Sequence, residues 1–434
     1  MYSLKKKYQG GMKVLLRDGE GERLNPFEPT THGFLGDKTW KGALMTARCN
    51  KNARPGYNSM KAHEYMEDPE VLREKVRLLA SLMKKSQATL AYTGAGISRA
   101  SGIDDYATKT TASDRKALMS PLDALPTTAH KAMAQLYWHK YLHYWIQQNH
   151  DGLPQKAGYP QHALNEIHGA WYDPSNPVVK MDGQLRSDLF EDLLNWEQKA
   201  DLVFAFGTSL AGMNADRLVT TCGEKAKNGK AIGPIIVNLQ QTACDSSAAL
   251  RIFAPLDQVL TMLVDELGCK AEDRKEDALG ALAADTPGLW QIPYNEQGLK
   301  SSKHTTLDLR PGARLRIVSG PYVGSEGEVQ GTNRQGHYKI TFRVQLKKFL
   351  APFPMVLGSW WVEAAVKGQV PALPVVTVTP APSPSHDRNE EKQNEEHFAS
   401  YCGRPVVLSG VSMADGGAPP KPLLDEITRR GKKF

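Results

Sequence analysis

The stretch that most constrains the fold is residues 89–102, TLAYTGAGISRASG. Its first part, residues 89–93, is β-branched, aromatic or apolar and predicts a buried strand. Gly-Ala-Gly follows at 94–96, and glycine permits a close approach of the backbone to a ligand. Ser98 and Ser101 are residues that cap and begin helices. A strand, a tight turn and a helix start predict a diphosphate cradle, because helix N-termini favour negative charge.

The Gly-Ala-Gly turn alone leaves a second interpretation open. It lacks the third glycine of the dinucleotide fingerprint. A tight turn between a core strand and a surface helix would use the same residues. The neighbouring sequence therefore has to decide between a ligand cradle and a plain turn.

Apolar runs and helical periodicity alternate along the middle of the chain. Further buried strands are predicted over residues 200–206, 234–238 and 250–253. Helical spacing predicts helices over residues 70–85, 127–146, 213–228 and 256–267, with a helix or loop over 185–197. This alternation predicts a Rossmann-like α/β fold, a doubly wound parallel sheet with helices on both faces. Ligands in such folds bind at the carboxyl ends of the strands.

Five motifs occur in the same order as in the sirtuin family, which the chain resembles. They are GAGIS at 94–98, QNHDGL at 148–153, EIHG at 166–169, GTSL at 207–210 and IVNL at 236–239. Each motif alone has low specificity, but the ordered set is specific. The resemblance covers residues 68–270.

The resemblance implies an NAD-dependent protein-lysine deacylase that transfers the acyl group to ADP-ribose and releases nicotinamide. His168 would be the general base acting on a ribose hydroxyl, since histidine titrates near neutral pH. Asn149 would hold the ribose or an attacking water, and Asp151 would bind the nicotinamide amide. Taken alone, His168 also fits a core or surface histidine, and the Asn149–Asp151 stretch also fits a turn.

The resemblance also assigns the contacts to NAD. They are Gly94, Ala95, Gly96, Ser98, Asp105, Tyr106, Gln148, Asn149, Asp151, Gly207, Thr208, Ser209 and Asn238. His150 departs from the family, which usually has an aliphatic residue there. Residues 104–107, Asp-Asp-Tyr-Ala, replace the family's Pro-Asp-Phe-Arg, so a guanidinium is lost.

The zinc-binding lobe of the family has no counterpart in the cysteine pattern. Residues 171–184 are short and contain no cysteine, whereas a tetrahedral zinc site needs four ligands. We therefore expect no metal site and a lost zinc lobe. The chain has five cysteines and no Cys-x-x-Cys, which argues against a disulfide framework and favours a reducing compartment.

Two other functions remain open from the sequence. Residues 185–191 resemble the family's peptide-pairing segment only faintly. An NAD glycohydrolase or ADP-ribosyltransferase would need only the nicotinamide-ribose chemistry of Asn149, Asp151 and His168. A non-catalytic NAD-binding sensor is the third hypothesis.

Composition divides the chain into five parts. They are an N-terminal arm (1–67), the sirtuin-like domain (68–270), a polar linker (271–306), a small SH3-like β-barrel (307–367) and a Pro-rich, charged, mostly disordered tail (368–434). Trp40 and Tyr57 are candidate anchors of the arm. Residues 318–327, VSGPYVGSEG, resemble the KOW motif of SH3-like barrels. Such barrels bind RNA or protein, although a barrel without nucleic-acid contact fits equally well.

Charge and hydropathy limit the partners and the location. The net charge of +7 is mild. No apolar run reaches the ~18–20 residues of a membrane span, and no apolar segment follows the basic N-terminus. We expect an intracellular protein, undecided between nucleus and cytoplasm, with an acyl-lysine protein as substrate and no membrane contact. The sequence leaves open the acyl group, the target protein and the oligomeric state.

Overall fold

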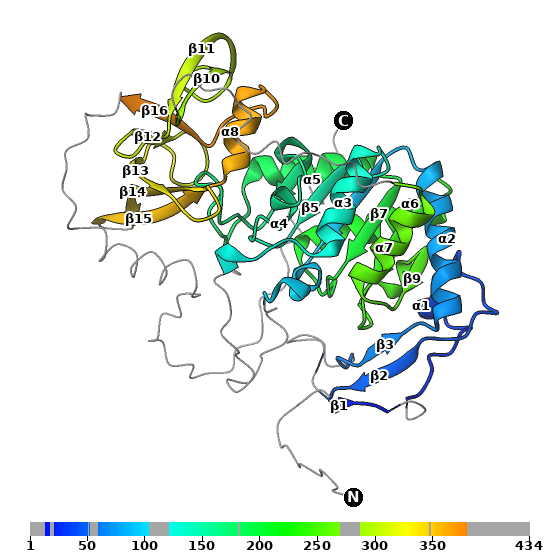
Figure 1. Cartoon of the computed structure of the whole chain (residues 1–434). Helices are drawn as coiled ribbons and strands as arrows, with labels where there is room; N and C mark the ends of the chain where they lie inside the picture. The colour runs from blue at the N-terminus through cyan, green and yellow to red at the C-terminus, as the bar shows by residue number, and fades with distance from the viewer. Residues whose placement is uncertain are drawn as a thin grey trace, which may run out of the picture. The chain divides into compact units, whose positions relative to one another are not determined.

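A six-stranded parallel sheet forms the centre of the chain (Figure 1). The computed structural model describes residues 14–17, 21–50, 52, 60–103, 121–180, 183–269, 287–346 and 349–379. The sheet has the order β6-β5-β4-β7-β8-β9. Its strands are β4 (Thr89–Thr93), β5 (Tyr144–Gln147), β6 (Leu164–Glu166), β7 (Leu202–Phe206), β8 (Gly233–Val237) and β9 (Leu250–Ile252).

The chain enters this sheet at a central strand, and the direction of winding then reverses. It runs outward from β4 to β6, and then returns to β7 on the other side of β4. The reversal creates a topological switch point beside β4, where loops leave neighbouring strands in opposite directions. All five strand pairs are parallel. The structure thus confirms the predicted Rossmann-like fold.

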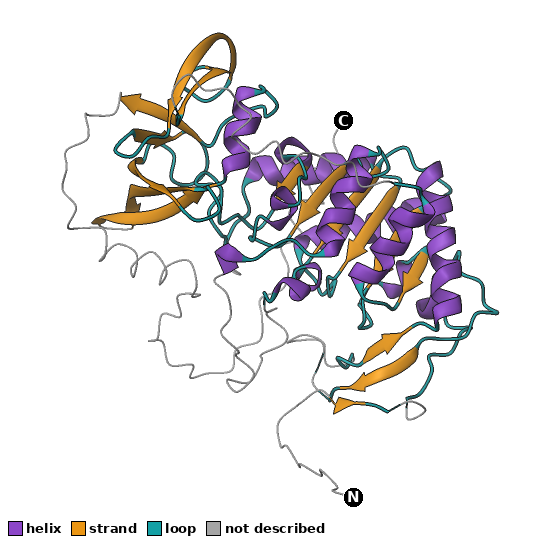
Figure 2. Cartoon of the chain, viewed as in Figure 1, coloured by secondary structure: helices purple, strands orange, loops and turns teal. Residues whose placement is uncertain are grey.

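Helices cover both faces of the sheet (Figure 2). On one face, α2 (Pro69–Lys85), α3 (Thr128–Trp138) and α7 (Leu256–Glu266) pack against inward residues such as Phe204. On the other, α5 (Ser187–Lys199) and α6 (Arg217–Lys227) pack against residues such as Val203. Successive strand residues serve opposite faces because side chains alternate along a strand. Both faces being covered explains why every residue of β4, β7 and β8 is buried.

The N-terminal arm contains regular structure. Strands β1 (Val14–Leu15), β2 (Leu44–Arg48) and β3 (Glu64–Met66) form an antiparallel sheet, and α1 (Pro29–His32) lies between β1 and β2 in sequence. Trp40 packs against the main core, whereas Tyr57 lies outside the described residues. The amide of Tyr65 donates to the carbonyl of Leu239, 2.8 Å away. The arm therefore reaches the loop that follows β8.

The C-terminal part of the described chain is antiparallel. Its larger sheet has the order β15-β14-β13-β12-β16, and β10 pairs with β11. The bounds are β10 (Leu289–Tyr294), β11 (Lys300–Asp308), β12 (Arg314–Ile317), β13 (Glu326–Thr332), β14 (Tyr338–Leu346), β15 (Phe349–Leu357), α8 (Ser359–Val366) and β16 (Val375–Thr379). Strands β12 to β15 and α8 lie within the small β domain predicted over 307–367, whereas β10, most of β11 and β16 lie outside those bounds, β16 in the predicted tail. The assignment of this domain to the SH3-like or KOW class stays a prediction.

Two expectations differ from the structure in the α/β part and in the linker. The helix expected over 127–146 ends at Trp138, and residues 144–147 form β5. Lys140 has a φ of 64°, which a helix does not allow. The apolar spacing of 133–145 fitted a helix, and periodicity cannot separate a short buried strand from a helical turn. The segment 271–306, expected to be a polar linker, carries β10 and most of β11. The many polar residues of β11 left no alternation of apolar and polar side chains to indicate a strand.

The helix expected from Ser98 or Ser101 is also wrong. After β4 the chain forms two 3₁₀ turns, Ala95–Ile97 and Arg99–Ser101, and neither has a side-chain cap. A 3₁₀ turn is too short to supply a full helix dipole. Any anion held here is therefore bound by local N–H and hydroxyl groups.

Candidate functional site

The turn after β4 packs tightly against the turn after β7. The amide of Gly96 donates to the carbonyl of Gly207 at 2.8 Å, and the amide of Gly94 donates to that of Phe206 at 3.2 Å. A Cβ on Gly96 would lie 2.6 Å from the Cα of Gly207. Gly207 itself has a φ of 59°. Close backbone contact therefore explains why both turns need glycine.

Three polar side chains meet beside this turn. The hydroxyl of Ser98, which is buried, donates to the Asp151 carboxylate at 2.6 Å. The Asn149 amide donates to the Ser98 oxygen at 2.9 Å and to the Gly94 carbonyl at 3.1 Å. Asp151 also accepts from the amide of Leu153, at 3.1 Å, where α4 (Leu153–Lys156) begins. The sequence places these residues about 50 positions apart, and the parallel pairing of β4 with β5 brings them together.

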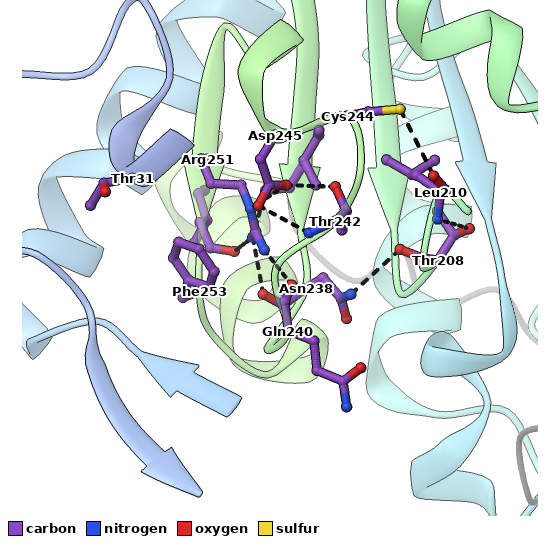
Figure 3. Close-up of polar contacts among 12 residues, drawn as sticks. Thr31, Thr208, Leu210, Asn238, Gln240, Thr242, Cys244, Asp245, Arg251 and Phe253 are labelled. Carbon is purple, nitrogen blue, oxygen red and sulfur yellow. Dashed lines mark hydrogen bonds and ion pairs between the residues drawn. The ribbon is translucent and has the colours of Figure 1, made fainter. Parts of the chain in front are cut away.

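A second set of polar contacts joins the ends of β5, β7 and β8. The Gln148 amide donates to the Thr208 hydroxyl at 2.9 Å. The Asn238 amide donates to the Thr208 carbonyl at 3.4 Å (Figure 3). Thr208, after β7, thus bonds to the residues that follow β5 and β8. Ser209 follows it and is half-buried.

His168 follows β6, the edge strand beside β5. Ile167 extends the pairing, since its amide donates to the Gln147 carbonyl at 3.2 Å. The His168 side chain is half-buried. The backbone carbonyl of His168 accepts from the backbone N–H of Val179 at 2.9 Å, so the chain after His168 folds back on this residue. This places a partly accessible imidazole at the same edge of the sheet as Asn149.

His150 is held in place by the backbone after His168. Its Nδ1 lies 2.8 Å from the Gly169 carbonyl, and its own carbonyl accepts from the amide of Trp171. Burial lowers the pKa of His150, and the Gly169 carbonyl opposes part of that change. A neutral ring that donates from Nδ1 to a carbonyl fits this environment.

Glu166 is a buried acid that the sequence motif contained but to which it assigned no role. Its two carboxyl oxygens accept from Gln147 at 3.0 Å and from Gln155 at 2.9 Å. Burial raises the pKa of Glu166 well above its usual range, and Asp173 adds to the rise. No sequence signal indicated this role, because residues 164–166, Leu-Asn-Glu, are too polar to predict a buried strand. The buried carboxyl, bound by two glutamine amides, anchors the strand end that precedes His168.

The predicted site residues gather at one edge of the sheet, with two exceptions. Gly94, Ala95, Gly96 and Ser98 follow β4; Gln148, Asn149 and Asp151 follow β5; Gly207, Thr208 and Ser209 follow β7; Asn238 follows β8. Asp105 and Tyr106 lie outside the described residues. Hydrogen bonds connect the four strand ends into one surface of amide, hydroxyl and carboxylate groups.

Metal-ligating side chains do not gather in the part of the chain that the structure describes. No group of three or more His, Cys, Asp or Glu is placed there to hold a metal ion. The described cysteines Cys49, Cys222, Cys244 and Cys269 are free and buried. The described residues do not provide the ligand set of a tetrahedral zinc site.

Comparison with known proteins identifies the family. No family model matches the chain. NAD-dependent protein deacetylase sirtuin-7 of Bos taurus is 30% identical over 353 residues, which cover 69% of this chain and 86% of that protein. The chain belongs to the sirtuin family.

Other sirtuins also match this chain. Sirtuin-7 of Homo sapiens is 30% identical across 69% of this chain and 86% of its own length. NAD-dependent protein deacetylase Sirt6 of Drosophila melanogaster is 30% identical across 54% and 87%. A solved structure, "Sir2-p53 peptide-NAD+", is 21% identical and covers 44% of this chain and 98% of its own, with a TM-score of 0.39. Family membership rests on the sequence relatives.

Proposed function

We propose that this sirtuin is an NAD-dependent protein-lysine deacylase. The observation that carries the proposal is the hydrogen-bonded surface at the ends of β4, β5, β7 and β8, with His168 after β6, in a chain of this family. The relatives are named NAD-dependent protein deacetylases. NAD is the co-substrate, an acyl-lysine side chain is the acyl donor, and nicotinamide is released.

The residues present fit a dinucleotide at this edge. The Gly94–Gly96 turn has no room for a Cβ at Gly96 and is half-exposed at Ala95 and Gly96, so backbone groups can approach a diphosphate. Asn238 would hold the adenosine ribose. Gln148, Thr208 and Ser209 would bind the middle of the NAD molecule.

The catalytic residues act at the nicotinamide end. Asp151 accepts from Ser98 and Leu153 and so presents a fixed, buried carboxylate to the nicotinamide amide. Asn149 orients a ribose hydroxyl or a water. His168 takes the proton from the ribose hydroxyl that receives the acyl group. It follows the edge strand β6 and is half-buried.

One feature favours a second candidate, NAD cleavage without a peptide. The segment after His168 is short, and its Val178 Cα would lie 2.5 Å from a Cβ on Gly169. The amides of Gly169, Ala170 and Val179 already donate to carbonyls of Glu166, Asn176 and His168, so they are not free to pair with a peptide strand. An NAD glycohydrolase or ADP-ribosyltransferase would use the same Asn149, Asp151 and His168.

The proposal also covers the cellular environment of the protein and the contact made by its C-terminal β domain. Within the described ranges, no helix combines the length and apolar character needed to cross a membrane. Free buried cysteines fit a reducing, intracellular environment. The β domain carries exposed cations such as Arg343 and is proposed to contact RNA or protein.

The test is nicotinamide release from NAD by purified protein, with and without an acetyl-lysine peptide. We expect release that depends on the peptide, and a loss of at least ~100-fold in His168→Ala, the usual contribution of a general base. His304→Ala, which alters an exposed histidine on β11, is the matched control. Peptide-independent release would establish the second candidate, and NAD binding without release would leave a sensor.

A further inference from the structure

Arg251, on β9, is a fully buried arginine that holds the backbone after β8 (Figure 3). Its guanidinium donates to the carbonyls of Asn238 at 3.0 Å and Ile252 at 2.7 Å. It also donates to the carbonyl of Gln240. One planar donor group therefore bonds two carbonyls of the turn that begins at Asn238 and one carbonyl of β9.

A buried carboxylate compensates the charge of Arg251. Its Nε lies 2.9 Å from Asp245, and both side chains are at most 2% exposed. Asp245 also accepts from the hydroxyl of Thr242 at 2.6 Å and from its amide at 3.0 Å. The guanidinium stacks on the Phe253 ring, 3.6 Å from its centroid. An arginine so buried would be costly if it were not paired in this way.

The turn fixed by Arg251 carries a proposed NAD contact. The Asn238 backbone N–H donates to the Ile252 carbonyl at 3.2 Å, the same carbonyl that Arg251 binds. The Asn238 side chain points to the Thr208 carbonyl (Figure 3). Loss of the guanidinium would free the carbonyls of Asn238 and Gln240 and release the turn that aims this side chain.

The N-terminal arm completes the support from the other side. The backbone N–H of Tyr65, on β3, donates to the carbonyl of Leu239, between the two residues held by Arg251. Buried Lys75 of α2 donates to the Arg251 carbonyl at 2.6 Å and pairs with Glu67. Glu67 in turn accepts from the amide of Phe253 at 3.1 Å. The turn is thus held between β9 and the arm.

We propose that Arg251 is a positioning residue for the adenosine end of NAD. It touches no substrate. It acts by fixing the turn from Asn238 to Gln240, so that the Asn238 amide meets the ribose without a reordering cost on binding. The inference rests on the proposed function, because Asn238 is assigned to NAD there.

Calorimetric titration with ADP-ribose, which contains the adenosine end, tests this role. Arg251→Lys keeps a positive charge beside Asp245 but lacks the planar fork that reaches several carbonyls. We expect its Kd for ADP-ribose to rise about tenfold, which corresponds to ~1.4 kcal/mol. The inhibition constant of nicotinamide reports on the opposite end of the NAD site. In Arg251→Lys it should stay within about twofold of the wild-type value.

Two further variants separate positioning from stability. Lys225→Met removes the bonds of a half-buried cation to the carbonyls of Gln198 and Ala200, which precede β7 and lie outside the turn, and should lower Tm without changing the Kd for ADP-ribose. Thr242→Val removes one support of Asp245 and should raise that Kd about threefold, the share of one hydrogen bond. This milder variant decides the question if Arg251→Lys does not fold.

Several outcomes would overturn the inference. They are an unchanged Kd in the folded variants at Arg251 or Thr242, an equal loss of ADP-ribose binding in Lys225→Met, or an equal loss of nicotinamide inhibition. A wild-type protein that binds no ADP-ribose would overturn both this inference and the proposed function. A wild-type protein that binds ADP-ribose but does not deacylate peptides would overturn only the proposed function.

Discussion

Single residues of the site are constrained by close backbone contact more than by charge. Gly96 lies against Gly207, and each would clash with the other if it carried a side chain. Ser98, Asn149 and Asp151 form a chain of hydrogen bonds at the ends of β4 and β5. These three side chains can act together only because the glycine turns after β4 and β7 allow the ends of the strands to lie close to one another.

Gly96→Ala should separate the turns after β4 and β7. The added Cβ would meet backbone 2.6 Å away, and backbone cannot yield as a flexible side chain would. We expect a destabilisation of about 1–3 kcal/mol, as for overpacked cores, together with weaker binding of ADP-ribose. Urea unfolding and calorimetry measure the two effects.

Gly102→Ala is the control for this prediction. Gly102 has a φ of +78°, and a Cβ added there would meet nothing within 4 Å, so alanine adds backbone strain without a clash. If both variants bind ADP-ribose equally well, contact between the two turns is not what makes Gly96 necessary.

At the scale of one element, the start of α3 depends on a neutral histidine. The hydroxyl of Thr127 accepts from the His130 amide at 3.2 Å, and the Thr127 amide donates to the His130 ring at 3.3 Å. This reciprocal cap works only while Nδ1 is unprotonated. Burial lowers the pKa of His130 to about 4, although Asp151 and Asp257 oppose the change.

The sign of the resulting pH dependence follows from this lowered pKa. Below pH 6.5 the unfolded chain binds a proton at His130 that the native state does not, until the pH approaches 4. The stability that His130 contributes is therefore fully present above pH 6.5 and is lost as the pH falls towards 4. One such histidine contributes a slope of up to ~1.4 kcal/mol per pH unit.

His130→Asn should reduce that slope by the share of one proton, because asparagine does not titrate. The variant is expected to be less stable at pH 7 and to lose less stability between pH 6.5 and 4. His32 and His337, whose pKa values burial also lowers to about 4, keep the remaining slope. Urea midpoints across this range measure it, and an unchanged slope would contradict the assignment.

At the scale of the whole molecule, the C-terminal β domain contacts the segment that follows His168. Tyr172 packs against Trp360 of α8, with ring centroids 5.1 Å apart, and against His337 at 4.9 Å. The amide of Gly358 donates to the Tyr172 carbonyl at 3.0 Å. The Tyr172 hydroxyl donates to the Leu122 carbonyl at 2.7 Å. One tyrosine therefore links the β domain to two loops of the α/β domain.

Trp360→Ala should loosen these loops. We expect a loss of about 2–4 kcal/mol, near the lower part of the range for large aromatic truncations because Trp360 is only half-buried. Hydrogen exchange should accelerate at residues 122–124 and 170–173. Phe349→Ala, which removes an exposed ring from the same domain, is the control. Equal exchange in both variants would contradict a supporting role for this contact.

The local sequence by itself predicted the parallel sheet and four of its six strands, β4, β7, β8 and β9. Buried runs such as 202–206 have only one stable arrangement when helices flank them, and glycine turns at their ends fix where a ligand can approach. The strand and turn patterns predicted that Gly94, Gly207 and Asn238 follow the carboxyl ends of strands, and the structure places them after β4, β7 and β8. Strand β5 was missed because its four residues carry too little periodic signal to separate strand from helix.

Only the tertiary structure decided how the site is supported. Arg251 and Tyr172 look like ordinary strand and loop residues in the sequence, and their partners are distant along the chain or belong to another element. Burial turns Arg251 into the group that satisfies the carbonyls after β8. Contact with Trp360 turns Tyr172 into a link between domains. Such roles depend on which polar groups become buried beside one another in the fold, and a local sequence pattern does not contain that information.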